Sequence, residues 1–166
     1  MRIIAPEGSF DDVLPTGEIG EICLSGASLA AGYLGDPERT KSRFVDGWWR
    51  SGDLGRLDED GFLFFEGRAD NMINTGGIKV YGEEIEAILL AHPGIQMVAV
   101  VGQPDEKWGN RIVAHIVASG DLTEEDVLAF CDARGMAGFK KPRELHFHDA
   151  LPLGPTGKLD RGALKS

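Results

Sequence analysis

The residue best suited to a chemical role is Lys158, which lies near the end of the chain in the segment Leu151–Arg161. Two prolines and two glycines belong to this segment, a composition typical of a loop. A lysine ammonium is a compact point charge on a flexible stem. Such a cation can bridge a carboxylate and a phosphate, whose mutual repulsion opposes their reaction. Most lysines in turns are solvated surface residues, so Lys158 by itself leaves both interpretations open.

Two further charged side chains adjoin glycines. Asp53 stands between glycines after an expected strand, and its carboxylate can accept hydrogen bonds from both hydroxyls of a ribose. Arg68 opens the stretch Gly67–Asp70 and can add a cation. The alternatives are an aspartate in an ordinary turn and an arginine in an ordinary surface ion pair.

Two other patterns point to less specific chemistry. The loop before Lys158 does not fit a Walker-type phosphate loop, because no serine or threonine follows the lysine and no strand-to-helix context surrounds it. His146 and His148 alternate along an expected strand, and no cysteine or carboxylate constellation accompanies them. We interpret them as a solvent-facing pair and predict no metal site.

The first 70 residues predict a small glycine-rich β-structure. Asp36 is an expected N-cap with Pro37 at the first helical position, which opens a short helix to about Phe44. The continuous apolar run Phe62–Phe65 predicts a buried strand. This segment carries more aromatic surface than 70 residues can hide alone, so we expect it to pack on something larger.

From about Asn71 the pattern changes to a compact α+β unit. We predict a hairpin around Gly76 and Gly77, a helix that ends before Pro93, and a second helix that Thr123 caps and Gly135 ends. Three β-rich stretches, 95–101, 112–117 and 143–148, complete the expected order βαββαβ.

Composition narrows the classes of partner. The 166 residues carry a net charge of −10, which argues against nucleic-acid and anionic-membrane partners. No apolar run reaches the ~20 residues that a membrane span needs. Cys23 and Cys131 lie far apart and indicate buried, reduced thiols. We therefore expect a cytoplasmic protein.

Three stretches in register, Trp49–Gly55, Gly67–Glu86 and Leu151–Arg161, resemble the C-terminal third of the adenylate-forming acyl-CoA synthetases. The resemblance runs from about Pro15 to Ala163. It implies an α+β fold in which residues 1–70 form a partial β-barrel, the distal β-subdomain of the large AMP-binding domain. Residues 71–166 would form the C-terminal lid, with a three-stranded sheet, two helices and a β-hairpin.

The same resemblance implies a role for each candidate residue. Lys158 is the expected catalytic cation of acyl-AMP formation, while Asp53, Arg68 and Lys79 are expected to hold the nucleotide. Asp70 is the expected hinge between the large domain and the lid.

Gly76 and Gly77 would lie beside the tunnel that admits the pantetheine arm of CoA. The implied substrates are a carboxylic acid, ATP with Mg²⁺, and CoA, and we expect none of them to bind tightly to this segment alone. The family loop that cradles the ATP phosphates does not occur in these 166 residues, so we expect no activity without an N-terminal domain.

Several alternatives stay open at this point. A related adenylation domain would load a carrier protein instead of free CoA, and luciferase-like oxidation is a more distant option. A stand-alone lid could instead serve as a non-catalytic protein-binding module or as a split subunit. The acyl substrate is not encoded here, and unpaired strand edges in residues 1–70 leave homo-oligomerisation open.

Overall fold

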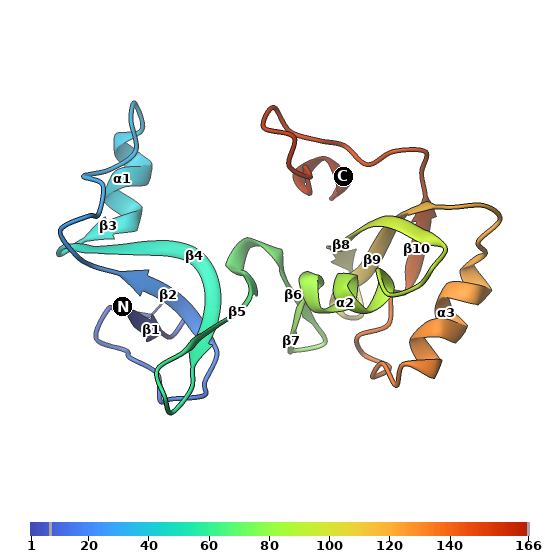
Figure 1. The fold of residues 1–166 in the computed structure, drawn as a ribbon, viewed down its shortest axis with the longest axis horizontal. Coiled ribbons are helices and arrows are strands. Elements are labelled where there is room, and N and C mark those ends of the chain that lie inside the picture. The colour runs from blue at the N-terminus through green and yellow to red at the C-terminus, as the bar shows by residue number, and fades with distance from the viewer. Residues whose placement is uncertain (7, 166) are drawn as a thin grey trace. The chain divides into compact units, whose positions relative to one another are not determined.

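The computed structural model describes residues 1–6 and 8–165, which divide into two compact units, Met1–Asp70 and Asn71–Ser166. Figure 1 shows a β-rich first unit and a second unit in which helices pack on a sheet. The predicted α+β class is therefore confirmed. The boundary between the units falls inside a short 3-10 turn, Ala69–Asn71.

The first unit is a curled, antiparallel sheet. Its strands are β1 (Arg2–Ile4), β2 (Gly20–Leu24), β3 (Phe44–Val45), β4 (Trp48–Leu57) and β5 (Leu63–Arg68), in the order β1-β2-β4-β3 with β5 paired to β4. Register shifts interrupt both the β2–β4 and the β4–β5 pairings, and such irregularities bend a strand. The bend of β4 in Figure 1 gives the sheet the curl expected of a partial barrel.

A short helix, α1 (Pro37–Arg43), joins β2 to β3. The Asp36 carboxylate accepts a hydrogen bond from the Arg39 backbone N–H at 2.9 Å, which satisfies one free donor of the first turn. The predicted cap and the proline at the first helical position are thus both confirmed.

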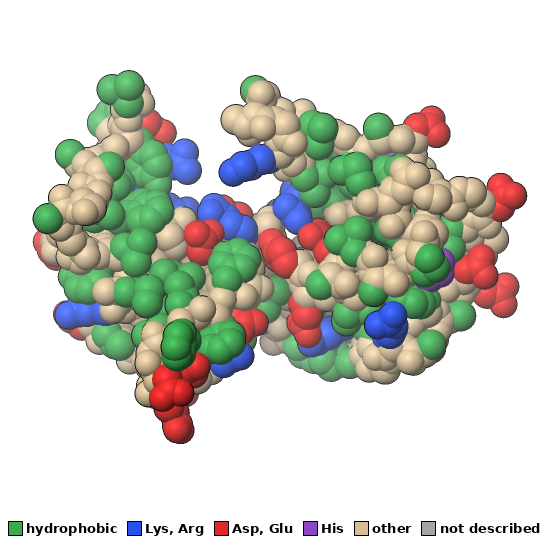
Figure 2. Space-filling model, viewed as in Figure 1, with side chains coloured by type: hydrophobic (Ala, Val, Ile, Leu, Met, Phe, Trp, Pro, Cys, Tyr) green, Lys and Arg blue, Asp and Glu red, His purple; other side chains and the backbone are tan. Residues whose placement is uncertain are grey.

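The prediction that Phe62–Phe65 forms a buried strand is wrong in its burial. The segment contributes to β5, but Phe62 and Phe65 are 67% and 61% exposed. The physical reason is that no second layer of the described residues covers these side chains. Hydrophobic side chains consequently gather on the visible surface of the first unit (Figure 2).

The second unit is built on a three-stranded sheet in the order β10-β9-β8. Its strands are β8 (Ile95–Asp105), β9 (Gly109–Ala118) and β10 (Glu144–Phe147), with β8 antiparallel and β10 parallel to β9. A hairpin, β6 (Met72–Thr75) and β7 (Ile78–Tyr81), precedes helix α2 (Gly82–Leu89). Helix α3 (Glu124–Ala133) connects β9 to β10.

Local sequence explains where α3 begins and ends. The Thr123 hydroxyl accepts a hydrogen bond from the Asp126 backbone N–H, while the Asp126 carboxylate accepts one from the Thr123 N–H. This reciprocal capping box matches the prediction. Gly135 has a φ of 69°, the left-handed geometry with which glycine often follows the end of a helix.

The sheet of the second unit has two separately covered faces. The helices and the hairpin bury one face through Ile73, Val80, Ile85, Leu89, Val98, Val100, Ile112, Ala114, Ile116, Val127 and Cys131. The segment after β10 buries the opposite face, where Leu151 and Leu164 contact side chains including Ala99, Val101, Val113 and Val117. We name this covering stretch, residues 151–165, the lysine segment.

Both cysteines are free and buried, as predicted. Burial, aided by the charge of Glu21, raises the pKa of the Cys23 thiol to about 11, so this group stays protonated at neutral pH. Among the described residues, no helix is long and apolar enough to cross a bilayer.

Candidate functional site

Asp53 and Arg68 lie opposite each other on β4 and β5. Arg68 Nη1 donates to Asp53 Oδ1 at 2.7 Å, although 15 positions separate the two residues in sequence. The Asp53 backbone N–H donates to Ser51 Oγ at 2.9 Å, and that hydroxyl donates to the Ile22 carbonyl at 2.8 Å. This chain of bonds fixes the backbone that carries the candidate nucleotide carboxylate.

Arg68 also reaches the predicted hinge residue. Its Nη2 atom lies 3.3 Å from Asp70 Oδ2, so one guanidinium contacts both carboxylates. Partial burial lowers the pKa of Arg68, but the hydrogen bonds and charges of Asp53 and Asp70 outweigh that effect and raise it. The structure thus brings three of the predicted site residues together.

A buried carboxylate that the sequence did not reveal supports this corner of the sheet. Glu21 is 5% exposed and forms ion pairs with Arg43 at 3.3 Å and Arg50 at 2.6 Å. It also accepts a hydrogen bond from the Gly52 backbone N–H at 3.1 Å. Gly52 has a φ of 77°, and a Cβ there would approach Arg43 and Arg68 at 3.2 and 3.3 Å. The glycine before Asp53 therefore allows two guanidinium groups to pack beside the backbone.

The glycine hairpin forms where the sequence predicted it. Gly76 and Gly77 have φ angles of 60° and 83° and close the two-residue turn between Thr75 and Ile78. Positive φ at both central positions matches the twist of a tight hairpin, and glycine adopts it at low cost. Lys79 is exposed on β7 opposite Asn74.

Lys158 projects from a small closed loop of the lysine segment. The Gly154 N–H donates to the Lys158 carbonyl at 2.7 Å, and Leu153 and Leu159 form an isolated β-bridge. The Lys158 side chain is exposed, and within the described part of the chain no carboxylate pairs with it. Its ammonium is therefore free to move on its stem.

The two ends of the lysine segment are anchored firmly. Leu151 and Leu164 are buried against the sheet. Arg161 Nη2 donates to both oxygens of Glu86 on α2, at 2.9 and 2.7 Å. Glu86 Oε1 in turn accepts from the Val100 N–H on β8 at 2.8 Å. The backbone that carries Lys158 is thus tied to the core on both sides of the loop.

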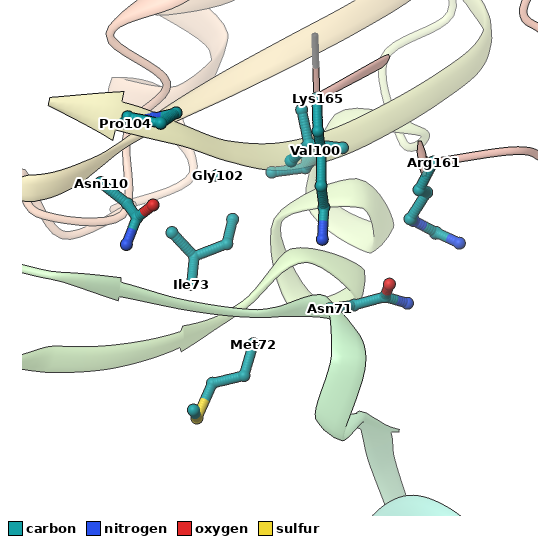
Figure 3. A pocket seen from close by; sticks show the side chains of 10 residues that line it. Asn71, Met72, Ile73, Val100, Gly102, Pro104, Asn110, Arg161 and Lys165 are labelled. Carbon is teal, nitrogen blue, oxygen red and sulfur yellow. The ribbon is translucent and has the colours of Figure 1, made fainter. Parts of the chain in front are cut away.

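A cavity of about 300 Å³ lies beside this anchor. Its lining includes the apolar side chains of Ile73 and Val100 and the polar side chains of Asn71, Asn110, Arg161 and Lys165, which Figure 3 shows around one space. The Arg161–Glu86 pair at its margin explains why this arginine is oriented toward α2.

The second unit places its two predicted functional loops on opposite faces of one sheet. The glycine hairpin belongs to the helix-covered face, because Ile73 and Val80 join that core. The lysine segment covers the other face. Figure 1 shows the segment passing on one side of β8–β10, with the hairpin on the other side. The structure therefore does not bring Lys158 together with Gly76 and Gly77.

The interpretation of His146 and His148 as a solvent-facing pair holds only in part, because the His146 side chain is 42% exposed but both rings also pack on a third histidine. Both rings stack on His115 of β9, each with a centroid separation of 5.1 Å. His115 Nδ1 lies 2.9 Å from His148 Nε2, and His146 Nε2 lies 2.9 Å from Glu144. The parallel β9–β10 pairing, which single-strand patterns do not predict, sets His146 directly opposite His115. No described group of residues has the arrangement of a metal site.

From the histidine cluster we predict that the second unit becomes less stable at acidic pH. Burial, followed by the charges of His146 and His148, lowers the pKa of His115 from 6.5 to about 4, although Glu144 and the Leu164 carbonyl act in the opposite direction. His115 is only 5% exposed. An unfolded chain therefore binds this proton more readily than the folded one. The free energy of unfolding is therefore highest above pH 6.5. It falls by roughly 3 kcal/mol at most as the pH decreases toward 4.

The measurement is denaturant unfolding at pH 7.5 and at pH 5, with amide exchange in β9 as the local readout. We expect His115→Phe to flatten the pH dependence in this window. His92→Phe is the matched control, because this histidine packs on Phe130 of α3, outside the cluster. Equal acid sensitivity in the wild type and in His115→Phe would contradict the assignment.

Comparison with known proteins shows which fold this chain resembles. Residues 84–158 match the family described as AMP-binding enzyme C-terminal domain. MenE from Bacillus subtilis, solved with the acyl-adenylate intermediate OSB-AMP, matches 99% of this chain and 33% of its own, with a TM-score of 0.90 and 32% identity. These matches place the chain with the C-terminal region of the adenylate-forming enzymes and confirm the resemblance drawn from the motifs.

The curated relatives most similar in this comparison include acid–CoA ligases. The chain is 42% identical over 146 residues to the 2-succinylbenzoate–CoA ligase of Listeria monocytogenes, covering 88% of this chain and 31% of that protein. It is 37% identical over 163 residues to the long-chain-fatty-acid–CoA ligase FadD13 of Mycobacterium tuberculosis, covering 98% of this chain and 32% of that protein. The chain thus spans about a third of the length of the curated relatives it matches.

Proposed function

We propose that this chain provides the C-terminal part of an ATP-dependent carboxylic acid–CoA ligase. In the first step a carboxylate oxygen attacks the α-phosphorus of ATP, which enters with Mg²⁺, and pyrophosphate leaves. In the second step the sulfur of CoA attacks the acyl carbon of the acyl-AMP, the thiol proton is lost, and AMP leaves. A large domain, which holds the rest of the nucleotide and the acid, is the necessary partner.

The observation that carries the proposal is the placement of Lys158 and the glycine hairpin on opposite faces of one sheet. A single fixed site cannot receive both loops from one orientation of this unit. Two half-reactions that use the loops in turn therefore require the unit to reorient. The 3-10 turn Ala69–Asn71, which contains Asp70, is where we place the pivot, because a few residues between compact units can absorb such a change.

Lys158 is the proposed catalyst of adenylation. Among the residues that the structure describes, its ammonium has no ion pair, yet Arg161–Glu86 and the buried leucines anchor the backbone around it. An anchored loop with a mobile cation can be delivered as a unit to the place where carboxylate and phosphate meet. There its charge would offset their repulsion as the new bond forms.

Asp53 and Arg68 are the proposed nucleotide contacts of the first unit. Arg68 donates to Asp53 Oδ1, which leaves the second carboxylate oxygen available to ribose hydroxyls. The same guanidinium contacts Asp70, so nucleotide binding and the pivot would share one cation. Lys79 is a further proposed nucleotide contact, available in one orientation of the second unit.

The relatives define the carboxylic acid substrate and the thiol that accepts the acyl group less closely than the reaction type. The two relatives are named for acids as different as 2-succinylbenzoate and long-chain fatty acids, so their names do not define the acyl group. Free CoA is the acceptor that both names state. A carrier-protein thiol would require the same lid movement, and a direct comparison of both thiols distinguishes them.

A chimeric ligase tests the proposal. The matching third of the Listeria 2-succinylbenzoate–CoA ligase would be replaced by this chain, and pyrophosphate release and acyl-CoA formation would be measured. We expect both half-reactions to occur. A chimera that folds, binds ATP and yet forms neither product would contradict the proposal, and the host ligase rejoined at the same boundary is the control.

A second candidate function, a non-catalytic protein-binding module, is favoured by one observation, the exposed side chains Phe62–Phe65 on an edge strand. Under our proposal these side chains contact the large domain.

We expect the 166 residues alone, with ATP and a panel of acids, to release no pyrophosphate. Release by the isolated chain would contradict the need for a large domain, whereas an inactive chimera would favour the binding module.

A further inference from the structure

The two glycines of the hairpin turn differ in what surrounds them. A Cβ added to Gly77 would meet no heavy atom within 4 Å. A Cβ added to Gly76 would lie 2.9 Å from Cε3 and 3.3 Å from Cζ3 of Trp108. Both residues need a positive φ, but only Gly76 is also in contact with an aromatic ring.

Trp108 belongs to the turn between β8 and β9, which holds the hairpin through its backbone as well. The Gly76 N–H donates to the Trp108 carbonyl at 2.8 Å. Asn110 Nδ2 donates to the Asn74 carbonyl at 3.1 Å. Asp105 Oδ1 accepts from the Trp108 N–H at 2.9 Å and thereby fixes the turn itself. The tip of one hairpin is therefore seated on the turn of another.

The indole ring is held in turn by cations. The guanidinium carbon of Arg143 lies 4.4 Å from its centroid, and the ammonium of Lys107 lies 5.0 Å away. A cation over a tryptophan face restricts the ring through its quadrupole. The ring thus has a defined orientation against Gly76, although Trp108 is only partly buried.

We propose that Trp108 is a positioning residue for thioester formation, which it serves by fixing the tip of the glycine hairpin. This inference rests on the proposed function, in which Gly76 and Gly77 lie beside the path of the CoA thiol. An error of an ångström in that path misplaces the sulfur relative to the acyl carbon and slows its attack. Adenylation uses Lys158 on the opposite face, so it does not depend on this contact.

The first test needs only the 166-residue chain. Amide exchange of residues 72–81 would be measured in Gly76→Ala, in Gly77→Ala as the matched control, and in each of them combined with Trp108→Ala. We expect Gly76→Ala to increase hairpin opening about tenfold more than Gly77→Ala. With Trp108→Ala present, we expect the two alanines to become equivalent, because only strain at positive φ then remains. A difference between them that persists without the indole would overturn the proposed contact.

The second test uses the chimeric ligase. We expect Trp108→Ala to slow attack of CoA on supplied acyl-AMP at least tenfold and to change adenylation less than twofold. Trp108→Phe removes the ring atoms next to Gly76 but keeps an aromatic face for Arg143, so it covers the case in which alanine prevents folding. Phe139→Ala is the matched control, because this exposed aromatic has a lysine neighbour but belongs to neither the hairpin nor the turn between β8 and β9.

The outcomes separate the two proposals. Equal loss in both half-reactions, or no loss in either, would overturn the role of Trp108 and leave the ligase assignment intact. A wild-type chimera with no ligase activity would contradict the proposed function. The exchange measurements on the chain would then still decide whether Trp108 positions the hairpin tip.

Discussion

Replacing Lys158 with alanine should slow acyl-AMP formation by about a hundredfold to a thousandfold in the chimeric ligase, the range for removing one electrostatic contact to a transition state. Attack of CoA on supplied acyl-AMP should change less than threefold. The reason is structural, because Lys158 and the glycine hairpin lie on opposite faces of the sheet. Measuring pyrophosphate release and thioester formation separately distinguishes the two steps.

Two controls sharpen this result. Lys158→Arg retains the charge but changes its shape, so we expect partial activity if a compact point charge is what matters. Lys141→Ala removes another lysine of the same unit, one that pairs with Asp132, and should leave both steps unchanged. Equal loss of both half-reactions in Lys158→Ala would refute the assigned role.

Replacing Glu86 with alanine should destabilise the second unit by about 3 kcal/mol, because it leaves the partly buried Arg161 without its partner. It also removes the acceptor of the Val100 N–H inside the core. The lysine segment should loosen as a result. Denaturant unfolding measures the stability, and amide exchange at residues 160–165 reports the local change.

Glu84→Ala is the matched control on the same helix. Glu84 pairs with Lys140 on the exposed surface, so its loss should cost less than about 1 kcal/mol. In the chimera, Glu86→Ala should impair adenylation more than thioester formation, since it releases the segment that carries Lys158. An effect of Glu84→Ala as large as that of Glu86→Ala would contradict this account.

Much of the secondary structure was predictable from local signals. Asp36, Thr123 and Gly135 mark helix ends through bonds or backbone angles that involve only a few neighbouring residues. The paired glycines of the hairpin are equally local. The run Phe62–Phe65 was misjudged because a strand pattern does not state whether another layer covers it.

The candidate site also has features that the sequence predicted and features that only the structure showed. The motifs around Asp53, Arg68 and Lys158 resemble those of a known family, and this resemblance predicted nucleotide and phosphate chemistry. The sequence did not predict that Arg68 contacts both Asp53 and Asp70, because this depends on the register between β4 and β5. The contact of Trp108 with Gly76 likewise joins two turns that lie far apart in sequence.

The amino-acid sequence by itself determined the order of elements, the helix caps, the glycine hairpin and the identity of the charged groups. Each of these depends on interactions between near neighbours along the chain. Only the tertiary structure decided that His115 lies beneath His146 and His148, and that Arg161 closes on Glu86 across 75 positions. It also decided which segment covers each face of the sheet. Alternation along a strand defines two faces, but long-range packing selects what covers them.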